Sequence, residues 1–181
     1  MNPAVLIVDM QPYFLRTAVN KEIIIDSQKK LIRYCDKKNI PVVLIQSVSV
    51  ETGKEYGWTI DEIWKEWLKI SSQKNIVDKI GPDAFTTQYL NEELTSWEID
   101  FILFAGVYGG QCVRKTAKHA INLGYEIASS KDLISDEPAG RRMNENLWPS
   151  TKQFFDREGK LCENYSETVK TLQDCLEGKS K

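Results

Sequence analysis

The segment that most constrains the fold spans residues 101–124 and reads FILFAGVYGGQCVRKTAKHAINLG. Residues 102–105 form a short continuous apolar run, which is typical of a strand covered on both faces of a sheet. Three glycines follow that give the backbone freedom for a tight turn: Gly106, Gly109 and Gly110. From Cys112 onward, apolar or small residues recur at helical spacing as far as Gly124, the expected C-cap glycine. The segment therefore predicts a buried strand, a glycine turn and a helix that begins at Cys112.

The rest of the chain repeats this alternation of apolar runs and helical patterns. Further buried strands are predicted at residues 4–8, 41–46, 75–78 and 125–129, with a short edge strand at 161–162. Helices are predicted at residues 21–38, from 59 onward, and at 87–97, 139–155 and 167–176. Loops are predicted at 10–14, where Pro12 blocks helix continuation, and at 47–58, 80–85 and 131–136. This alternation predicts an α/β fold with a doubly wound parallel sheet. We expect one domain over residues 1–181, because no repeat, low-complexity tract or linker divides the chain.

Composition excludes several classes of partner. The formal net charge of the 181 residues is -2 and no basic block stands out, which argues against nucleic acid or an anionic membrane. The apolar run at 4–8 is too short to span a bilayer and lacks signal-peptide features, so we expect a cytoplasmic protein. No G-x-G-x-x-G or Walker A pattern occurs, so a nucleotide is not the obvious ligand.

The four cysteines and the single histidine do not suggest a metal site. No C-x-x-C pair occurs and His119 lies in the middle of a predicted helix, so a zinc site is not expected. Cys35 and Cys175 fit the apolar stripes of two helices and are predicted to be core residues. Cys162 is the other cysteine outside a predicted helix core.

Cys112 is the candidate nucleophile. A thiol in the first helical turn lies near unpaired backbone N–H groups and the positive end of the helix dipole, so its pKa is expected to fall. The same N–H groups could hold a developing oxyanion. The alternative is that Cys112 is a small apolar residue packed under the turn.

Two charged residues are predicted to join Cys112 at one edge of the sheet. Asp9 and Lys79 each follow a predicted strand, and the carboxyl ends of parallel strands share an edge where ligands bind. A thiolate attacks a carbonyl, while Asp9 moves the proton and Lys79 keeps Asp9 ionised. Alternatively, Asp9 caps a loop and Lys79 is a solvated side chain.

Three stretches also resemble a known family. AVLIVDMQPYF, DKIGPDAF and FAGVYGGQCVRKTAKHAINLGYEIASSKD, within residues 4–132, resemble the isochorismatase-like cysteine hydrolases, which include nicotinamidases and N-carbamoylsarcosine amidases. The resemblance implies a Rossmann-like three-layer sandwich around a six-stranded parallel sheet of order 3-2-1-4-5-6. It implies a catalytic triad of Asp9, Lys79 and Cys112, and it implies a homo-oligomer, either a dimer or a tetramer.

The resemblance extends to the backbone of the nucleophile turn. It implies a cis peptide between Val107 and Tyr108, and an oxyanion hole formed by the backbone N–H groups of Tyr108 and Cys112. The aromatic ring of Tyr108 either narrows the pocket or presents its hydroxyl to the substrate.

The substrate pocket is expected to involve residues near these strand ends. We expect loop 47–58 and the following tryptophan helix to shape it, with Phe14, Gln46, Phe85 and Tyr108 as substrate-binding residues. Three tryptophans lie close together in this region, which indicates core or interface packing, or alternatively a lid or dimer contact: Trp58, Trp64 and Trp67.

Departures from the family pattern narrow the expected reaction. Nicotinamidases carry a D-x-H and a further histidine that bind a metal, whereas this chain reads QSVSVETGKEYGW there, without histidine. Isochorismatases proper do not use a cysteine at the nucleophile position. We therefore expect a hydrolase that cleaves an amide or carbamoyl C–N bond of a small molecule through a thioester, with no metal and no cofactor. The alternatives are a non-catalytic binding protein on the same fold and a redox-sensing thiol with a Cys112–Cys162 disulfide.

Overall fold

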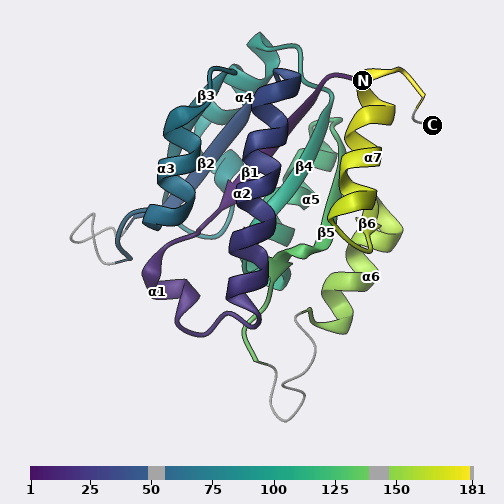
Figure 1. Cartoon of the computed structure of the whole chain (residues 1–181). Helices are drawn as coiled ribbons and strands as arrows, with labels where there is room; N and C mark the ends of the chain where they lie inside the picture. Colours follow the sequence, from purple (N-terminus) through teal and green to yellow (C-terminus); the bar gives the residue numbers. More distant parts are fainter. Residues whose placement is uncertain (49–55, 139–146, 180–181) are drawn as a thin grey trace.

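The computed structural model describes residues 1–48, 56–138 and 147–179. Six parallel strands form one sheet in the order β3-β2-β1-β4-β5-β6, as predicted (Figure 1). The strands are β1 (Pro3–Val8), β2 (Val42–Ser47), β3 (Lys74–Lys79), β4 (Phe101–Val107), β5 (Glu126–Ser135) and β6 (Lys160–Cys162). The helices are α1 (Pro12–Leu15), α2 (Lys21–Lys38), α3 (Asp61–Lys69), α4 (Gln88–Ser96), α5 (Arg114–Asn122), α6 (Pro149–Glu158) and α7 (Tyr165–Leu176).

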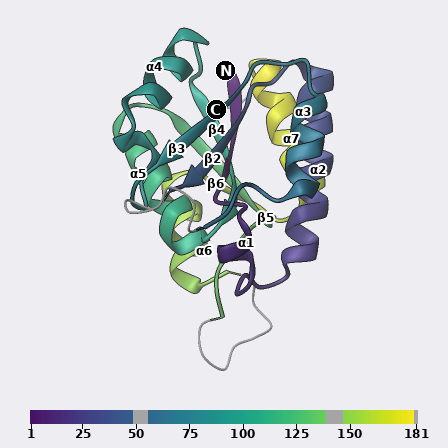
Figure 2. The same ribbon diagram turned by 90° about the vertical axis from the view of Figure 1, so that its left-hand side faces the viewer.

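The sheet lies between two layers of helices. Figure 2 shows α2, α3 and α7 on one face and α4, α5 and α6 on the other. Successive residues of β1 enter different cores: Val5 and Ile7 pack with α2, while Leu6 and Val8 pack with α4 and α5. Because both faces are covered, both sets of side chains must be apolar, which explains the uninterrupted apolar runs of the inner strands.

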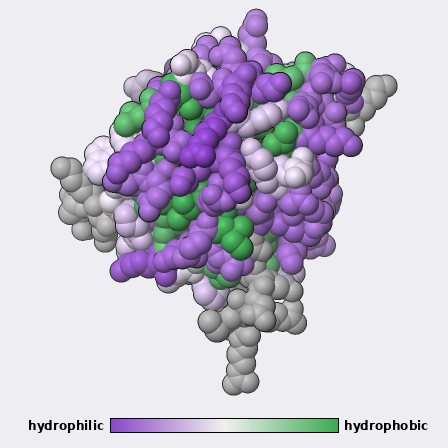
Figure 3. All heavy atoms as spheres, viewed as in Figure 1, coloured by the Kyte–Doolittle hydropathy of each residue, from purple (hydrophilic) through white to green (hydrophobic). Residues whose placement is uncertain are grey.

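The outer side of the α2 layer faces solvent. Figure 3 shows this face as mostly hydrophilic, with hydrophobic side chains visible between the charged ones. In α2, residues at helical spacing are buried, among them Ile24, Leu31 and Cys35. The helix ends as predicted at Asn39, whose left-handed backbone (φ 55°) terminates the helical path. No helix in the described ranges is long and apolar enough to cross a membrane.

Two predictions around proline were wrong. Pro12 was expected to keep residues 10–14 in a loop, but it begins α1, because the missing N–H of proline costs nothing at the first helical position. The helix predicted over 139–155 begins instead at Pro149 for the same reason. The predicted residues 139–146 lie outside the described part of the chain, as do residues 49–55 of the predicted loop.

The predicted loop at 131–136 is also wrong, because β5 continues to Ser135. The pairing of β5 with β4 shifts register between Phe104 and Gly106, and β5 resumes with Leu133 and Ile134 fully buried. An irregularity of this kind re-aims a strand without ending it. The carboxyl end of β5 therefore reaches the edge where Asp9 and Lys79 lie.

The helix after β4 begins earlier than predicted and in a different form. Gly109–Val113 is one π-helical turn, and α5 follows directly from Arg114. Cys112 is thus inside the π-helical turn rather than at the start of an α-helix. Gly124 follows α5 with φ +95°, as expected for a residue that ends the helix.

Candidate active site

A buried ion pair forms where three neighbouring strands end. Asp9 directly follows β1, and Ser47 and Lys79 are the last residues of β2 and β3. Lys79 Nζ lies 2.9 Å from Asp9 Oδ2 and 2.6 Å from Ser47 Oγ, and it also donates to the Gly81 carbonyl at 3.0 Å. Ser47 Oγ in turn donates to Asp9 Oδ1 at 3.0 Å. Both carboxylate oxygens and the ammonium are therefore held in fixed positions.

The backbone of Asp9 adopts an uncommon conformation. Its φ is 53°, in the left-handed region that aspartate tolerates better than most residues. Its N–H continues the strand pairing by donating to the Ile45 carbonyl at 2.8 Å. Gln11 holds the end of β2 in place. Its side chain accepts from Ser47 N–H at 2.8 Å and donates to the Ser47 carbonyl at 3.0 Å.

The structure brings Cys112 to this pair. Cys112 is half-buried, and its thiol is close enough to Asp9 and Lys79 for the carboxylate and the ammonium both to influence its pKa. The three residues that sequence analysis selected from separate strand ends thus meet at one edge of the sheet. Their catalytic roles stay predictions.

Electrostatics at the thiol are opposite to the sequence-based expectation. The pKa of Cys112 is raised to about 12, chiefly by burial and also by the charge of Asp9, while the charge of Lys79 opposes the rise. Burial likewise raises the pKa of Asp9, against the charge and hydrogen bond of Lys79. The predicted lowered thiol pKa is wrong because burial disfavours the thiolate, and the positive charge of Lys79, which would favour it, is offset by Asp9.

Gly106 allows β4 to approach β1 closely just before the nucleophile turn. Its φ is +111°, and a Cβ at this position would lie 2.0 Å from the Val8 carbonyl oxygen. No other amino acid fits such a contact. The next peptide but one, Val107–Tyr108, is cis, as the family resemblance implied. The strand end that carries Asp9 and the turn that carries Cys112 therefore lie against one another.

Asp136 anchors the nucleophile turn from the other side. Its buried carboxylate accepts Gly110 N–H at 2.5 Å on Oδ1, and Trp148 N–H and Thr151 Oγ1, each at 2.9 Å, on Oδ2. A Cβ at Gly110 would meet the Trp148 ring at 2.7 Å, so the turn is also closely packed. Asp136 ties the turn to the beginning of α6.

Tyr108 links the nucleophile turn to α1. Its hydroxyl donates to the Phe14 carbonyl at 2.7 Å and lies 2.5 Å from Thr17 Oγ1. Phe14 packs edge-on against the Tyr108 ring and also contacts Tyr13 and Tyr56, forming an aromatic cluster. The Tyr108 side chain was expected either to narrow the pocket with its ring or to present its hydroxyl to the substrate. Because the hydroxyl already makes these bonds, the second role is the less compatible with the structure.

Two other predicted substrate-binding residues make structural contacts. The side-chain carbonyl of Gln46 accepts from Thr59 N–H at 2.7 Å and from its hydroxyl at 2.9 Å. Phe85 packs against His119 and Tyr125 at ring-centroid distances of 5.5 and 5.9 Å. These contacts account for both side chains without a substrate, so they give the predicted binding roles no support.

The three tryptophans differ in burial. Trp67 is buried, stacks on Trp64 at 5.3 Å and donates to the Val42 carbonyl at 3.0 Å. Trp58 is 61% exposed. Trp67 is thus the packing residue that its helical spacing indicated, and an interface role is left to Trp58 alone.

The other cysteines lie away from the candidate site. Cys35, Cys162 and Cys175 are fully buried, and no cysteine in the described part of the chain is disulfide-bonded. Cys162 lies in edge strand β6, with its sulfur 3.5 Å from Thr171 Oγ1. This position does not favour a Cys112–Cys162 disulfide. Across the described ranges, no three His, Cys, Asp or Glu side chains gather closely enough to hold a metal ion.

Sequence analysis missed three polar residues that organise this edge: Gln11, Ser47 and Asp136. The available signal was their position, because each lies at or within three residues of a strand end. Their individual partners depend on tertiary structure and leave no local pattern.

Comparison with known proteins agrees with this architecture. The isochorismatase domain model matches residues 3–145. A curated relative, Isochorismatase family protein 2A of Dictyostelium discoideum, is 27% identical over 129 residues, which cover 68% of this chain and 62% of that protein. The chain thus aligns with less than two thirds of that relative's length.

Two solved structures share the fold. Nicotinamidase from Staphylococcus aureus aligns with a TM-score of 0.76 and 19% identity, over 91% of this chain and 99% of that one. N-carbamoylsarcosine amidase from Thermoplasma acidophilum aligns with a TM-score of 0.72 and 21% identity, over 91% and 97% of the two chains. At these identities the comparison establishes a common fold.

Proposed function

The chain belongs to the isochorismatase family, and from this premise we propose that it is a cysteine hydrolase that cleaves an amide or carbamoyl C–N bond of a small molecule. The observation that carries the proposal is the buried Asp9–Lys79 pair, whose two charges both act on the half-buried Cys112 thiol beside it. A nucleophile, a base and a cation that orients the base are the parts that such a reaction needs.

The first half of the reaction forms a thioester. Cys112 sulfur attacks the substrate carbonyl while Asp9 accepts the thiol proton. Because burial raises the pKa of the thiol to about 12, proton transfer accompanies attack instead of preceding it. The raised pKa of Asp9 makes that carboxylate a stronger base than an exposed aspartate. Asp9 then gives the proton to the departing nitrogen, and ammonia or an amine leaves.

The second half restores the thiol. Water attacks the thioester while Asp9 accepts a water proton, and the sulfur leaves and is reprotonated. Lys79 keeps Asp9 ionised and oriented through both halves. The proposed oxyanion donors are the backbone N–H groups of Cys112, within the π-helical turn, and of Tyr108, which directly precedes that turn.

The substrate is proposed to enter beside the aromatic cluster of Tyr13, Phe14, Tyr56 and Tyr108. These rings pack together next to the nucleophile turn and offer an apolar wall for a small substrate. The active protein is proposed to be a homo-oligomer, with the exposed Trp58 available for a subunit contact.

An ammonia-release screen over small amides, ureas and carbamoyl compounds tests the proposal. We expect turnover of at least one compound, loss of turnover in Cys112→Ala, and a substrate-derived acyl adduct on Cys112 by intact mass spectrometry. Undiminished turnover in Cys112→Ala rejects the cysteine mechanism. Ligand binding without any release of ammonia or amine would instead favour a non-catalytic binding protein.

A further inference from the structure

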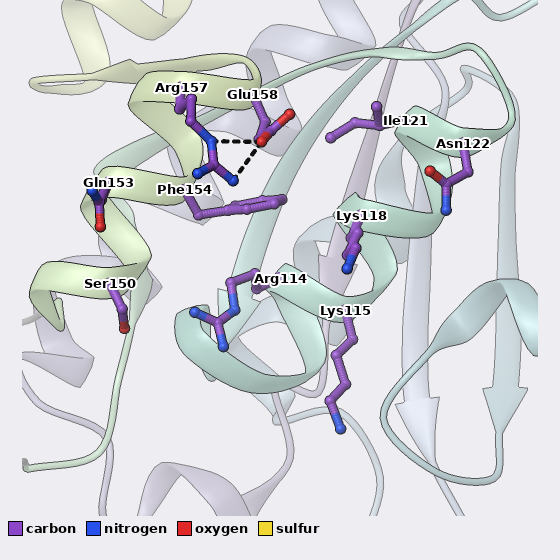
Figure 4. A pocket seen from close by; sticks show the side chains of 10 residues that line it. All are labelled: Arg114, Lys115, Lys118, Ile121, Asn122, Ser150, Gln153, Phe154, Arg157 and Glu158. Carbon is purple, nitrogen blue, oxygen red and sulfur yellow. Dashed lines mark hydrogen bonds and ion pairs between the residues drawn. The ribbon is translucent and has the colours of Figure 1, made fainter.

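A second cavity lies between α5 and α6, away from Asp9 and Lys79 (Figure 4). We call it the α5/α6 groove; its volume is about 490 Å³, and its polar and aromatic lining includes Arg114, Lys115, Lys118, Phe154, Arg157 and Glu158. The lining residues of each helix recur at intervals of three or four, so one face of α5 lies opposite one face of α6. The volume is in the range of pockets that hold small molecules.

The groove concentrates positive charge in a chain whose net charge is -2. Four of its residues are cationic, and only Glu158 is acidic. Glu158 is already bonded to Arg157 at 2.6 Å. Within the described ranges, Arg114, Lys115 and Lys118 form no ion pair. An anion bound here would therefore meet Arg114 and Lys118, whose charges no carboxylate in the described ranges offsets, whereas Figure 4 shows Lys115 extending away from Phe154.

The spacing of two of these cations along α5 favours the binding of an anion from solution. Arg114 and Lys118 are four residues apart on α5, an arrangement in which like charges weaken a helix. Figure 4 shows both side chains on the α5 side of the groove, with Arg114 extending toward the side of the groove where Ser150 of α6 lies. A bound anion would remove the repulsion, and a guanidinium would hold phosphate or carboxylate oxygens in a fixed geometry.

Phe154 provides a rigid aromatic surface inside the groove. Its half-buried ring packs edge-on against fully buried Phe155, with centroids 5.1 Å apart. Figure 4 shows the ring projecting from α6 toward α5, between Arg114 on one side and the Arg157–Glu158 pair on the other. A planar group that enters the groove can stack on this ring while its anionic end reaches Arg114 and Lys118.

We propose that the α5/α6 groove binds a mononucleotide, with the phosphate against Arg114 and Lys118 and the base on Phe154. A phosphate carries more negative charge at neutral pH than a carboxylate, which suits the two cations Arg114 and Lys118. The combination of a planar group and a dianion within one small molecule matches both features of the groove. The proposal is independent of the hydrolytic function, because none of the groove residues is part of the Asp9–Lys79–Cys112 cluster.

Calorimetric titration of the full chain with AMP, GMP, CMP and UMP tests this, with the matching nucleosides and inorganic phosphate as comparison ligands. We expect at least one mononucleotide to bind tenfold or more tightly than its nucleoside and than phosphate, with affinity falling as salt is added. Arg114→Gln and Lys118→Gln should each weaken that binding about tenfold. Phe154→Leu should weaken mononucleotide binding but leave phosphate binding unchanged.

The matched control is Lys37→Gln, an exposed charge change in α2 on the opposite face of the sheet, which should leave affinity unchanged. Far-UV circular dichroism checks that each variant is folded. The proposal is overturned if none of the four mononucleotides binds at millimolar concentration, or if nucleosides bind the unaltered protein as tightly as mononucleotides. Equal weakening by Lys37→Gln and Lys118→Gln would also overturn it.

Discussion

Lys79 Nζ lies 2.9 Å from Asp9 Oδ2, and neither side chain is exposed to solvent. Ionised groups are expensive to bury, so each depends on the other and on Ser47, which bonds both. This pair has a direct effect on the thiol beside it. Because the negative and positive charges offset one another, burial dominates and the pKa of Cys112 rises to about 12.

The first prediction concerns alkylation of Cys112. With a pKa of about 12, the thiolate fraction at pH 7 is on the order of 10⁻⁵, and it grows about tenfold per pH unit. The rate of iodoacetamide labelling of Cys112, followed by mass spectrometry, should therefore rise between pH 7 and pH 10 without a plateau. A plateau near neutral pH would contradict the raised pKa.

Asp9→Asn is the informative comparison for this measurement. It removes the charge that opposes the thiolate and leaves Lys79 to stabilise it, so the thiol pKa should fall. Labelling at pH 7 should become faster than in the unaltered protein, while any hydrolytic turnover is lost. Slower labelling of Cys112 in Asp9→Asn would mean that Asp9 favours ionisation of the thiol in the protein without substrate, contrary to the prediction.

The second prediction concerns Lys79→Met. Removing one partner of a buried pair should lower the free energy of unfolding by about 3–5 kcal/mol, measured by urea denaturation. The double variant Asp9→Asn/Lys79→Met should recover part of this loss, because no carboxyl is then left without its cation. If Lys79→Met is as stable as the unaltered protein, the buried Asp9 carboxyl does not depend on Lys79.

The stability of Lys79→Met should also depend on pH. Burial already raises the pKa of Asp9 in the folded state, and loss of Lys79 removes the main opposing influence. A carboxyl whose folded pKa lies above its unfolded pKa binds protons more tightly when folded, so stability falls as pH rises from the unfolded pKa toward the folded one. Denaturation at a series of pH values from acid upward should show this fall, and it should be absent from the double variant.

The third prediction concerns Asp136→Asn. The amide can still accept Gly110 N–H, but its NH₂ group cannot accept from Trp148 and Thr151, so unfolding should become easier by about 1–3 kcal/mol. Thr151→Val removes only one of these bonds and should cost about 1 kcal/mol.

A positioning role for Asp136 has a separate consequence at the sulfur. If its carboxylate holds the nucleophile turn, Asp136→Ala, which leaves Gly110 N–H without this acceptor, should change the labelling rate of Cys112 under conditions where the variant is fully folded. Thr151→Val should leave that rate unchanged, because Gly110 N–H keeps its acceptor. Identical labelling in Asp136→Ala and the unaltered protein would mean that Asp136 stabilises the fold without positioning the sulfur.

The fourth prediction concerns Gly106→Ala. The added methyl would lie 2.0 Å from the Val8 carbonyl oxygen at φ +111°, so β1 and β4 must separate. We expect a loss of about 3–5 kcal/mol in the free energy of unfolding, from overpacking and backbone strain together. Gly124→Ala is the control, because Gly124 has φ +95° with no atom near its Cβ position, and it should cost about 1–2 kcal/mol. Equal losses in the two variants would assign the whole effect to backbone strain.

The sheet and most helices could be predicted because their patterns are local. The apolar run of β1 reflects burial on both faces, and the buried stripe of α2 gives the bounds Lys21–Lys38 directly. Strand order is not a local property, and here it came from the family resemblance. The second half of β5 was missed because Lys131 and Asp132 interrupt its apolar pattern at the register shift.

The candidate site was predictable in its charged residues but not in its electrostatics. Asp9, Lys79 and Cys112 stand out because each follows a strand. The supporting bonds join residues far apart in the sequence: Gln11 and Ser47 are separated by 36 positions, and Gly110 and Asp136 by 26. The direction of the thiol pKa follows from the burial of the sulfur and the charge balance around it, and neither is visible in a helix-start motif.

The left-handed backbone of Asp9 has a practical consequence for finding the natural substrate. Few residues adopt φ 53° readily, but asparagine is one of them and differs from aspartate by a single group. Exchange to asparagine therefore preserves the course of the main chain while removing the group that, in the proposed mechanism, protonates the departing nitrogen. Such a protein would capture its amide uncleaved, and mass spectrometry of what it retains from a cell extract would read out the compound that the family fold alone leaves unnamed.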